Sequence, residues 1–318
     1  MPGCSNANSA DSHHLLAIPH DIEKKKRRND GFDTGYLPTT DVLVVGAGPT
    51  GLTLACELMR RGIRCRIIEQ SDAPMPLART LGIQSRTLEV FERMGIVAQV
   101  LRQAARVDGN NFYAGTKRLV HMDFGLLAKD HSIPYPYGAS LPQTTTERIF
   151  TELLQASGAD IEWSSELVDF WQEDDAVVAL LKHPHDGSDE TIRARFLVGC
   201  DGAHSIVRKT LGFPFEGTTY EGETLHADVE LDWKKSHHEI HRWWSGFGQL
   251  DTVPMPGEQR WRLAAFVPAA SSQEVPRASR ELFQRFLHER ARENTAIARN
   301  PTSLANFTIN RRAVTQMR

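Results

Sequence analysis

Three glycines and one acid have the types and spacing of a nucleotide-binding site. Gly46, Gly48 and Gly51 form a G-x-G-x-x-G pattern, and Glu69 follows 23 residues after Gly46. Gly46 would permit a tight turn, Gly48 would let the backbone approach a pyrophosphate, and Gly51 would let a helix pack closely on a strand. Glu69 would accept hydrogen bonds from ribose hydroxyls. The chemistry that this pattern predicts is the binding of a dinucleotide.

The flanking segments supply the elements that such a site needs. Residues 41–45 form a valine-rich run that predicts a buried strand, and apolar residues then recur at helical spacing up to Gly62. Residues 64–69 predict a second strand that ends in Glu69. A glycine-rich turn in an ordinary α/β domain is the alternative interpretation, but it leaves Glu69 unexplained. The pattern by itself does not separate NAD from FAD.

Three later segments bear on the choice of nucleotide. Residues 79–95 (RTLGIQSRTLEVFERMG) predict a loop that enters a helix, with Leu88, Phe91 and Met94 as its buried stripe. Gln143 lies within LPQTTTERIF, residues 141–150. Residues 197–212 (LVGCDGAHSIVRKTLG) predict a strand, a turn and a helix.

Together with GAGPTGL (residues 46–52), these segments occur in the order found in the class A flavin monooxygenases. The chain resembles the para-hydroxybenzoate and phenol hydroxylase family over about residues 40–318 at the level of motif order. The resemblance implies an α/β fold in which a Rossmann-like, parallel FAD-binding sheet is interleaved with an antiparallel β substrate domain. It also implies FAD as cofactor, NAD(P)H as reductant and a small aromatic substrate.

The resemblance carries over to individual cofactor-binding positions. Asp201 and Gly202 match a pair that helps to hold FAD, although an acid just before a helix is also a common N-cap. Arg79 matches an arginine that reaches the cofactor, with a surface salt bridge as the alternative, and Gln143 matches a glutamine near the ribityl chain. The cofactor-binding residues implied are Gly46, Gly48, Gly51, Glu69, Arg79, Gln143, Asp201 and Gly202.

The predicted domains follow from the same comparison. We expect a disordered tail over residues 1–39, a discontinuous FAD-binding domain over 40–110 and 138–220, and substrate-domain segments over 111–137 and 221–299. Residues 300–318 would be a return strand to the FAD domain. The family continues into a second Gly-Asp flavin motif beyond this point, so the expectation is that these 318 residues alone are not a competent hydroxylase.

The predicted substrate region contains aromatic and histidine side chains but no assignable catalytic residue. Trp243, Trp244, Phe247, Trp261 and Phe266 could line a pocket, and the core of a sheet is the favoured interpretation. The histidines at 237, 238 and 241 are interpreted as a polar strand edge. Phenol hydroxylases commonly carry an acid where this chain has Leu81, so the catalytic residues stay unknown.

The predicted function is hydroxylation of a phenolic or other aromatic substrate by an FAD-dependent monooxygenase with NAD(P)H and O2. One alternative is an inactive relative that binds FAD weakly or not at all. Another is an NAD-dependent dehydrogenase or a nucleotide-binding module. Tyr113 and Lys117 have the Tyr-x-x-x-Lys spacing of some dehydrogenases, but that pair works only on a helix, and Gly115 with a strand-like run after it argues against one.

Composition restricts the other classes of function. The chain of 318 residues has a formal net charge of −3, which argues against a dedicated nucleic-acid binder. It contains no apolar run long enough to span a membrane, and its four cysteines form no C-x-x-C pair, so no metal site is predicted. A cytoplasmic location is expected, and the basic run at residues 24–28 leaves a nuclear address possible. The oligomeric state is not predicted.

Overall fold

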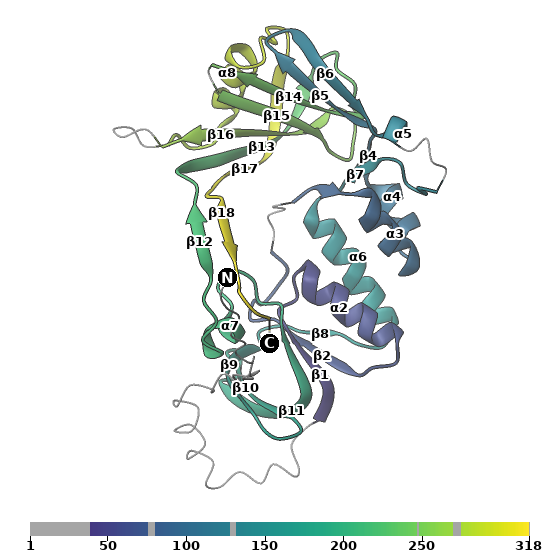
Figure 1. Ribbon diagram of the computed structural model, residues 1–318, viewed down its shortest axis with the longest axis vertical. Helices are drawn as coiled ribbons and strands as arrows, with labels where there is room; N and C mark the ends of the chain where they lie inside the picture. The colour runs from purple at the N-terminus through teal and green to yellow at the C-terminus, as the bar shows by residue number, and fades with distance from the viewer. Residues whose placement is uncertain (1–38, 76–79, 128–131, 247, 270–274, 318) are drawn as a thin grey trace, which may run out of the picture. The chain divides into compact units, whose positions relative to one another are not determined.

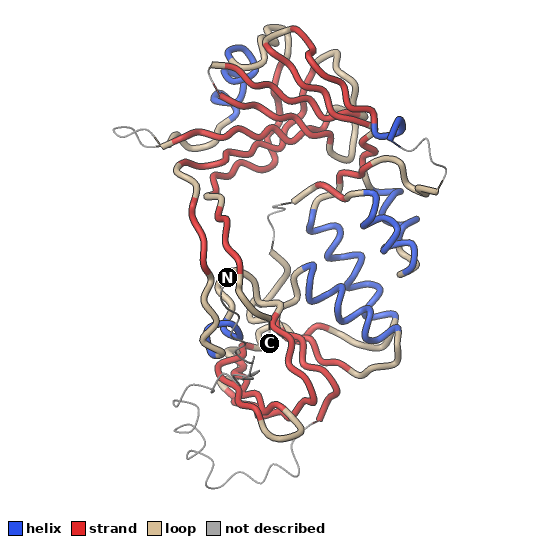
Figure 2. The backbone as a smooth tube through the Cα atoms, in the orientation of Figure 1, coloured by secondary structure: helices blue, strands red, loops and turns tan. Residues whose placement is uncertain are grey.

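The computed structural model describes residues 39–75, 80–127, 132–246, 248–269 and 275–317. The predicted tail over residues 1–39 therefore lies outside the described residues except for Thr39, and so does Arg79. The described chain contains two large sheets with their helices, as Figures 1 and 2 show. The mixed α/β class predicted from the sequence is confirmed, with parallel and antiparallel sheets in one chain.

The first large sheet has six strands and begins at the glycine-rich turn. Its order is β8 (Ile161–Glu162), β2 (Cys65–Ile68), β1 (Thr39–Val45), β11 (Ser188–Gly199), β10 (Val177–His183) and β9 (Glu166–Gln172). The strands from β8 to β11 pair in parallel, and β9 and β10 form an antiparallel hairpin. Residues 42–45 of β1 are all buried, which is typical of a parallel strand covered on both faces.

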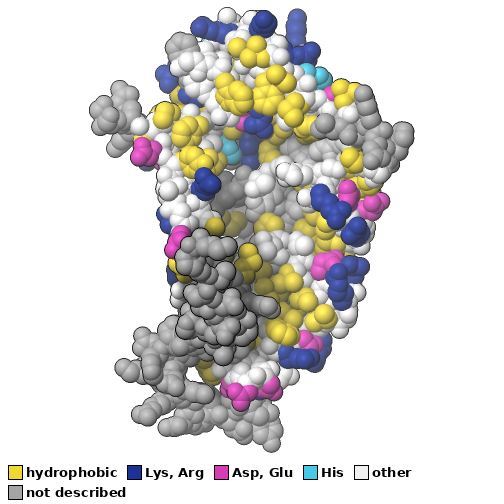
Figure 3. Space-filling view, in the orientation of Figure 1, with side chains coloured by type: hydrophobic (Ala, Val, Ile, Leu, Met, Phe, Trp, Pro, Cys, Tyr) yellow, Lys and Arg dark blue, Asp and Glu magenta, His cyan; other side chains and the backbone are white. Residues whose placement is uncertain are grey.

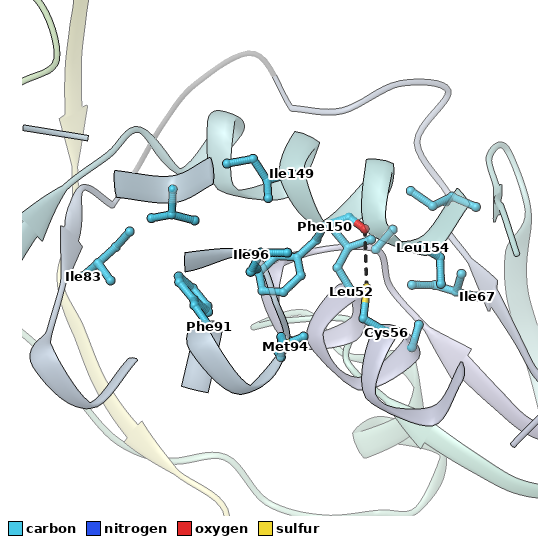
Figure 4. Close-up of a cluster of buried hydrophobic side chains, with 14 of the residues drawn as sticks. Leu52, Cys56, Ile67, Ile83, Phe91, Met94, Ile96, Ile149, Phe150 and Leu154 are labelled. Atoms are coloured by element: carbon cyan, nitrogen blue, oxygen red, sulfur yellow. Dashed lines mark hydrogen bonds between the residues drawn. The ribbon is translucent and has the colours of Figure 1, made fainter. Parts of the chain in front are cut away.

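Helices cover this sheet and build its main core. They are α2 (Pro49–Arg60), α3 (Ser85–Arg93), α4 (Val97–Gln103) and α6 (Gln143–Ala156), with a short α7 (Ile206–Thr210) after β11. Leu52 and Cys56 lie one turn apart on α2 and meet Phe150 of α6, whose backbone oxygen accepts a hydrogen bond from the Cys56 thiol at 3.4 Å (Figure 4). Phe91 of α3 packs edge-on against Phe150. The predicted helical stripe of Leu88, Phe91 and Met94 is confirmed as part of this core.

Two small sheets connect the larger ones along the chain. One contains β3 (Gly82–Ile83), β7 (Gly138–Ser140) and β4 (Ala105–Val107). The other pairs β12 (Glu216–Thr219) with β18 (Asn310–Ala313) in antiparallel fashion. A one-turn helix, α5 (Phe124–Leu127), follows β6.

The second large sheet has seven strands. Its order is β17 (Ile297–Phe307), β13 (Gly222–Asp232), β16 (Arg260–Pro268), β15 (Gly248–Pro254), β14 (Glu239–Ser245), β5 (Gly109–Ala114) and β6 (Lys117–Asp123). All its pairs are antiparallel except β14 with β5. The sheet thus joins strands from both predicted substrate-domain segments, while the domain boundaries themselves remain a prediction.

One face of the seven-stranded sheet is closed by α8 (Arg280–Glu289). Ser279 caps this helix by accepting a hydrogen bond from the Leu282 backbone N–H at 3.1 Å. Phe283 and Leu287 of α8 pack into a core with Trp243 and Trp261, which are fully buried. The interpretation of these two tryptophans as core is therefore confirmed, whereas Trp244, the next residue on β14, is 59% exposed.

Candidate nucleotide site

The glycine-rich turn between β1 and α2 requires glycine at two of its three positions. Gly46 has a φ of +102°, and a Cβ there would lie 2.6 Å from the backbone oxygen of Cys200. A Cβ on Gly51 would lie 1.9 Å from the backbone oxygen of Gly46. The turn is therefore tight at Gly46, and α2 approaches it closely at Gly51, as the pattern predicts.

Gly48 is different, because nothing in the protein requires a glycine there. Its φ of −72° and ψ of −179° are open to any residue, and a Cβ would meet no atom within 4 Å. Gly48 occupies the N-cap position of α2, where no side chain caps the helix. The N-terminus of α2 therefore lies beside open space that a side chain at position 48 would enter.

Glu69 follows β2 and braces the same turn. One carboxylate oxygen accepts a hydrogen bond from the Ala47 backbone N–H at 2.9 Å, and the other accepts one from the Ser71 N–H at 3.0 Å. A carboxylate has about four acceptor positions, so these two bonds leave capacity for hydroxyl donors. Glu69 therefore has a structural role that the sequence did not indicate, in addition to the predicted binding role.

Asp201 and Gly202 lie beyond the carboxyl end of β11, beside the turn. One oxygen of Asp201 accepts a hydrogen bond from the Val207 backbone N–H at 3.2 Å, whereas the residue that caps α7 is Ser205. The other oxygen, Oδ1, is buried and has no hydrogen-bond partner among the described residues. An unsatisfied buried acceptor is costly, so this atom has capacity for a donor from water or from a bound molecule. Gly202 has a φ of +73°, a conformation that favours glycine.

Gln143 begins α6 and faces the same region. Its side-chain amide donates to Glu147 at 2.8 Å, and its backbone N–H donates to the Thr80 oxygen at 3.1 Å. Burial raises the pKa of Glu147, an effect that the Gln143 hydrogen bond opposes. The Thr80 contact ties α6 to the end of the segment that contains Arg79.

A single cavity of about 1160 Å³ joins these groups. Six of the eight predicted binding residues line it, and the cavity also receives cationic side chains from Arg148 and Lys209. The lining residues among the predicted set are Gly46, Gly48, Glu69, Gln143, Asp201 and Gly202. Gly51 instead lies beneath the turn, where it is buried, and Arg79 is not described. The open side of Gly48 and the unpartnered Asp201 oxygen fit a nucleotide cofactor with phosphate and hydroxyl groups.

The structure excludes the helical arrangement that a Tyr-x-x-x-Lys dehydrogenase pair needs. Tyr113 lies in β5 and Lys117 begins β6, so the two residues belong to a hairpin. The Tyr113 hydroxyl is 3.2 Å from Nδ1 of His241. The match in spacing is therefore coincidental.

The interpretation of His241 as part of a polar strand edge is wrong. The side chain is 2% exposed, and its Nε2 lies 3.0 Å from the Ser236 oxygen. Burial lowers the pKa of His241 to about 4, so the ring is neutral near pH 7. A neutral ring that donates from Nε2 to Ser236 accepts at Nδ1 from the Tyr113 hydroxyl. Because polar residues flank His241 in the sequence, local hydrophobicity did not predict its burial.

The sequence profile of the family described as "FAD binding domain" matches residues 39–318, nearly all of the described chain. The chain belongs to this FAD-binding family. It is 33% identical over 285 residues to a flavin-dependent monooxygenase of Mycobacteroides abscessus. The aligned region covers 87% of this chain and 59% of that protein. It is 31% identical over 250 residues to pentachlorophenol 4-monooxygenase of Sphingobium chlorophenolicum, covering 77% of this chain and 45% of that protein.

Solved structures share the fold of this FAD-binding chain. The p-nitrophenol 4-monooxygenase of Pseudomonas putida superposes with a TM-score of 0.77 at 24% identity, covering 89% of this chain and 71% of that one. A ternary complex of aklavinone-11 hydroxylase with FAD and aklavinone gives a TM-score of 0.73 at 24% identity, covering 88% and 55%. The chain spans 59%, 48% and 38% of the first three curated relatives that it matches. Among the described residues, no helix has the length and apolarity to cross a membrane.

Proposed function

We propose that this chain provides the FAD-binding and substrate-facing parts of a monooxygenase that hydroxylates a phenolic or other aromatic compound, with NAD(P)H as reductant and O2 as co-substrate. The observation that carries the proposal is the cavity in which the open side of Gly48, the carboxylate of Glu69 and the unpartnered oxygen of Asp201 converge. The names of the relatives support the aromatic substrate class.

In this proposal the residues of the turn hold the phosphate-bearing part of FAD. The uncapped N-terminus of α2 offers N–H donors to the phosphates, and Gly48 leaves room for their approach. Gly46, in the wall of the cavity, and Gly51, beneath the turn, make that geometry possible. Glu69 accepts hydrogen bonds from the ribose while it fixes the turn through Ala47.

The remaining predicted residues act on the rest of the cofactor. Asp201 Oδ1 accepts from a hydroxyl of FAD, and Gly202 gives the following turn its left-handed conformation. Gln143 lies near the ribityl chain, and Arg79, which is outside the described residues, remains a predicted cofactor contact. FAD, when bound, supplies the oxygen-transfer chemistry after NAD(P)H has reduced it. The protein's part is to bind it, orient it and exclude water. We also propose a cytoplasmic location, which the free thiols of the three described cysteines support.

Titration of the purified chain with FAD, followed by flavin absorbance, tests the binding part of the proposal. Wild type is expected to bind FAD, and Asp201→Ala is expected to bind it at least tenfold more weakly. Asp189→Ala, on the exposed part of β11, is the matched control and should bind as wild type does. Equal affinity of wild type and Asp201→Ala would remove Asp201 from the site.

Turnover with NAD(P)H, O2 and 4-cresol tests the reaction part. Formation of a hydroxylated product in step with NAD(P)H oxidation, measured by mass spectrometry, is expected from these residues joined to the C-terminal Gly-Asp flavin motif of the family, whereas residues 1–318 alone are not expected to form it. Bound FAD without product would instead favour a nucleotide-binding module. A chain that binds no FAD would be an inactive relative.

A further inference from the structure

The face of the seven-stranded sheet opposite α8 combines charged, aromatic and small side chains. Leu225 and Ala227 of β13 point into the core with α8, so the alternate residues Thr224, His226 and Asp228 belong to the other face. On that face Trp244 is 59% exposed and Phe307 is 38% exposed. Figure 3 shows hydrophobic side chains gathered at the surface of this upper part of the molecule.

The strand register aligns several of these residues in one row across the sheet. His226 of β13 is opposite Ala264 of β16, and Ala264 is opposite Asp251 of β15. Asp251 is in turn opposite Arg242 of β14, which donates to it at 2.7 Å. Neighbouring strands lie about 4.8 Å apart, so His226 and Asp251 are separated by roughly 10 Å with only a methyl group between them.

We define the Ala264 site as His226, Asp251, Arg262, Ala264 and Phe266. Arg262 and Phe266 lie two residues before and after Ala264 on β16 and so belong to the same face. Ala264 itself is not fully buried, although both strands that flank it are central in the sheet. The short side chain therefore leaves the sheet accessible at a point that longer polar and aromatic side chains surround.

The charges around this point are fixed by pairing. Arg262 makes two hydrogen bonds to the Asp228 carboxylate, at 2.6 and 2.8 Å, and both side chains are buried. Asp251 is held by Arg242 and by the Gln249 amide. Two neutralised pairs thus border the Ala264 site, so its local surface carries little net charge.

His226 is the polar group of the site without a hydrogen bond. Its ring packs edge-on against Phe307 at 4.5 Å between centroids, and no described residue is its hydrogen-bond partner. Burial and, to a smaller extent, the charge of the nearby Arg262 lower the pKa of His226 to about 4, while Asp228 acts in the opposite direction. The imidazole is therefore neutral near pH 7 and has a free acceptor nitrogen.

We propose that the Ala264 site binds the ring of the aromatic substrate, and that His226 accepts a hydrogen bond from a hydroxyl group on that ring. This assignment rests on the proposed function and names the residue that selects for the hydroxyl. A weakly basic imidazole accepts the hydrogen bond without removing the proton, so His226 positions the substrate and does not ionise it. The apolar surfaces of Ala264 and Phe266 receive the ring itself.

Binding of 4-cresol and of its methyl ether, 4-methylanisole, distinguishes this role from a structural one. The ether keeps the ring but cannot donate a hydrogen bond. We expect wild type to bind 4-cresol at least tenfold more tightly than 4-methylanisole in equilibrium dialysis at pH 7. His226→Leu, which is close in size, should reduce that preference to within about twofold. His226→Gln keeps an acceptor and should retain part of the preference, and it serves if the leucine variant does not fold.

Two further variants complete the test. Ala264→Leu should weaken the binding of both compounds at least tenfold, because it fills the accessible point. His288→Gln, on the exposed side of α8, is the matched control and should leave both affinities unchanged. An unchanged hydroxyl preference in His226→Leu, or unchanged binding in Ala264→Leu, would overturn the proposal.

FAD affinity is measured in parallel on every variant. A wild-type chain that binds FAD but neither aromatic compound would overturn the Ala264 assignment while leaving FAD binding in place. Failure of FAD binding with an intact hydroxyl preference would instead overturn the proposed function and support the site. The two proposals therefore fail separately.

Discussion

The nucleotide cavity and the Ala264 face are built from different parts of the chain. The cavity depends on backbone conformation at the turn at Gly46, the open helix end at Gly48 and the loop at Gly202, to which side chains are added. The Ala264 site consists of side chains on the regular strands of a sheet. A backbone site constrains residue type through conformation and close approach. In a site built from strand side chains, the backbone fixes only which alternate residues lie on the same face.

This difference predicts which substitutions each region tolerates. A side chain at Gly46 would collide with the backbone of Cys200, and one at Gly51 would collide with the backbone of Gly46. Side chains on one face of a sheet can be exchanged without moving the strands, provided that buried charges stay paired. We therefore expect the nucleotide cavity to be sensitive to substitutions that change its backbone conformation. We expect the Ala264 site to be sensitive to substitutions that break its charge pairs.

The largest effect is expected from breaking the buried pair beside the Ala264 site. Arg262→Met leaves Asp228 buried without its partner, and we expect a loss of about 3–5 kcal/mol in the free energy of unfolding, measured by urea denaturation. The double variant with Asp228→Leu should regain most of it. Arg60→Met, which breaks an exposed pair with Glu57, is the control and should cost well under 1 kcal/mol. A mild effect of Arg262→Met would show that this face does not depend on paired charge.

The corresponding change in the backbone-built region is Gly51→Ala. The added Cβ would lie 1.9 Å from the Gly46 oxygen, so α2 and the turn must separate. We expect a loss of about 3 kcal/mol, the upper end of overpacking costs, in the same urea measurement. Gly246→Ala is the control, because a Cβ there meets nothing within 4 Å. Equal stability of the two variants would contradict the close approach.

Acid should weaken the seven-stranded sheet through its buried histidines. His226 and His241 have pKa values lowered to about 4 in the folded chain, against about 6.5 when unfolded. Between these values the unfolded chain binds more protons, so stability is lost as the pH falls from about 6.5 towards 4, by about 1.4 kcal/mol per pH unit for each histidine. Relative to wild type, His226→Leu should therefore gain in thermal midpoint as the pH falls. A difference that stays constant with pH would refute this.

The smallest expected effect is on cofactor affinity alone. Gly48→Val places a side chain in open space, so folding should be unaffected while FAD binding weakens about tenfold, or about 1.4 kcal/mol. Gly246→Val controls for the substitution itself. If the thermal midpoint of Gly48→Val falls as far as that of Gly51→Ala, the two glycines do not have the separate roles described.

The sequence predicted the elements around the glycine-rich turn because each has a local signal. The buried strand, the helix α2 that ends at Arg60 just before Gly62, and the stripe of α3 all follow hydrophobic periodicity. The convergence of Gln143 and Asp201 on the turn came from motif order and lay beyond local patterns. Whether these residues hold FAD remains a prediction.

The proposed Ala264 site and the burial of His241 could not be predicted from the sequence alone. The alternation of Thr224, His226 and Asp228 with apolar residues was visible, but it does not show which face a helix will cover. The register that aligns His226, Ala264 and Asp251 joins three strands through long-range pairing. Such pairing depends on the whole sheet, which no window of sequence contains.

The contact between Gly46 and Cys200 has a consequence for the order of folding. The Cys200 backbone N–H donates to the Val45 oxygen at 2.7 Å, so the end of β11 closes against the glycine-rich turn. The two segments are far apart along the chain, and bringing them together requires slow loop closure. The cavity cannot exist until β11 has been added beside β1. The appearance of cofactor affinity during refolding would therefore mark the completion of the six-stranded sheet. An N-terminal fragment that ends before β11 would become compact but would not bind the cofactor.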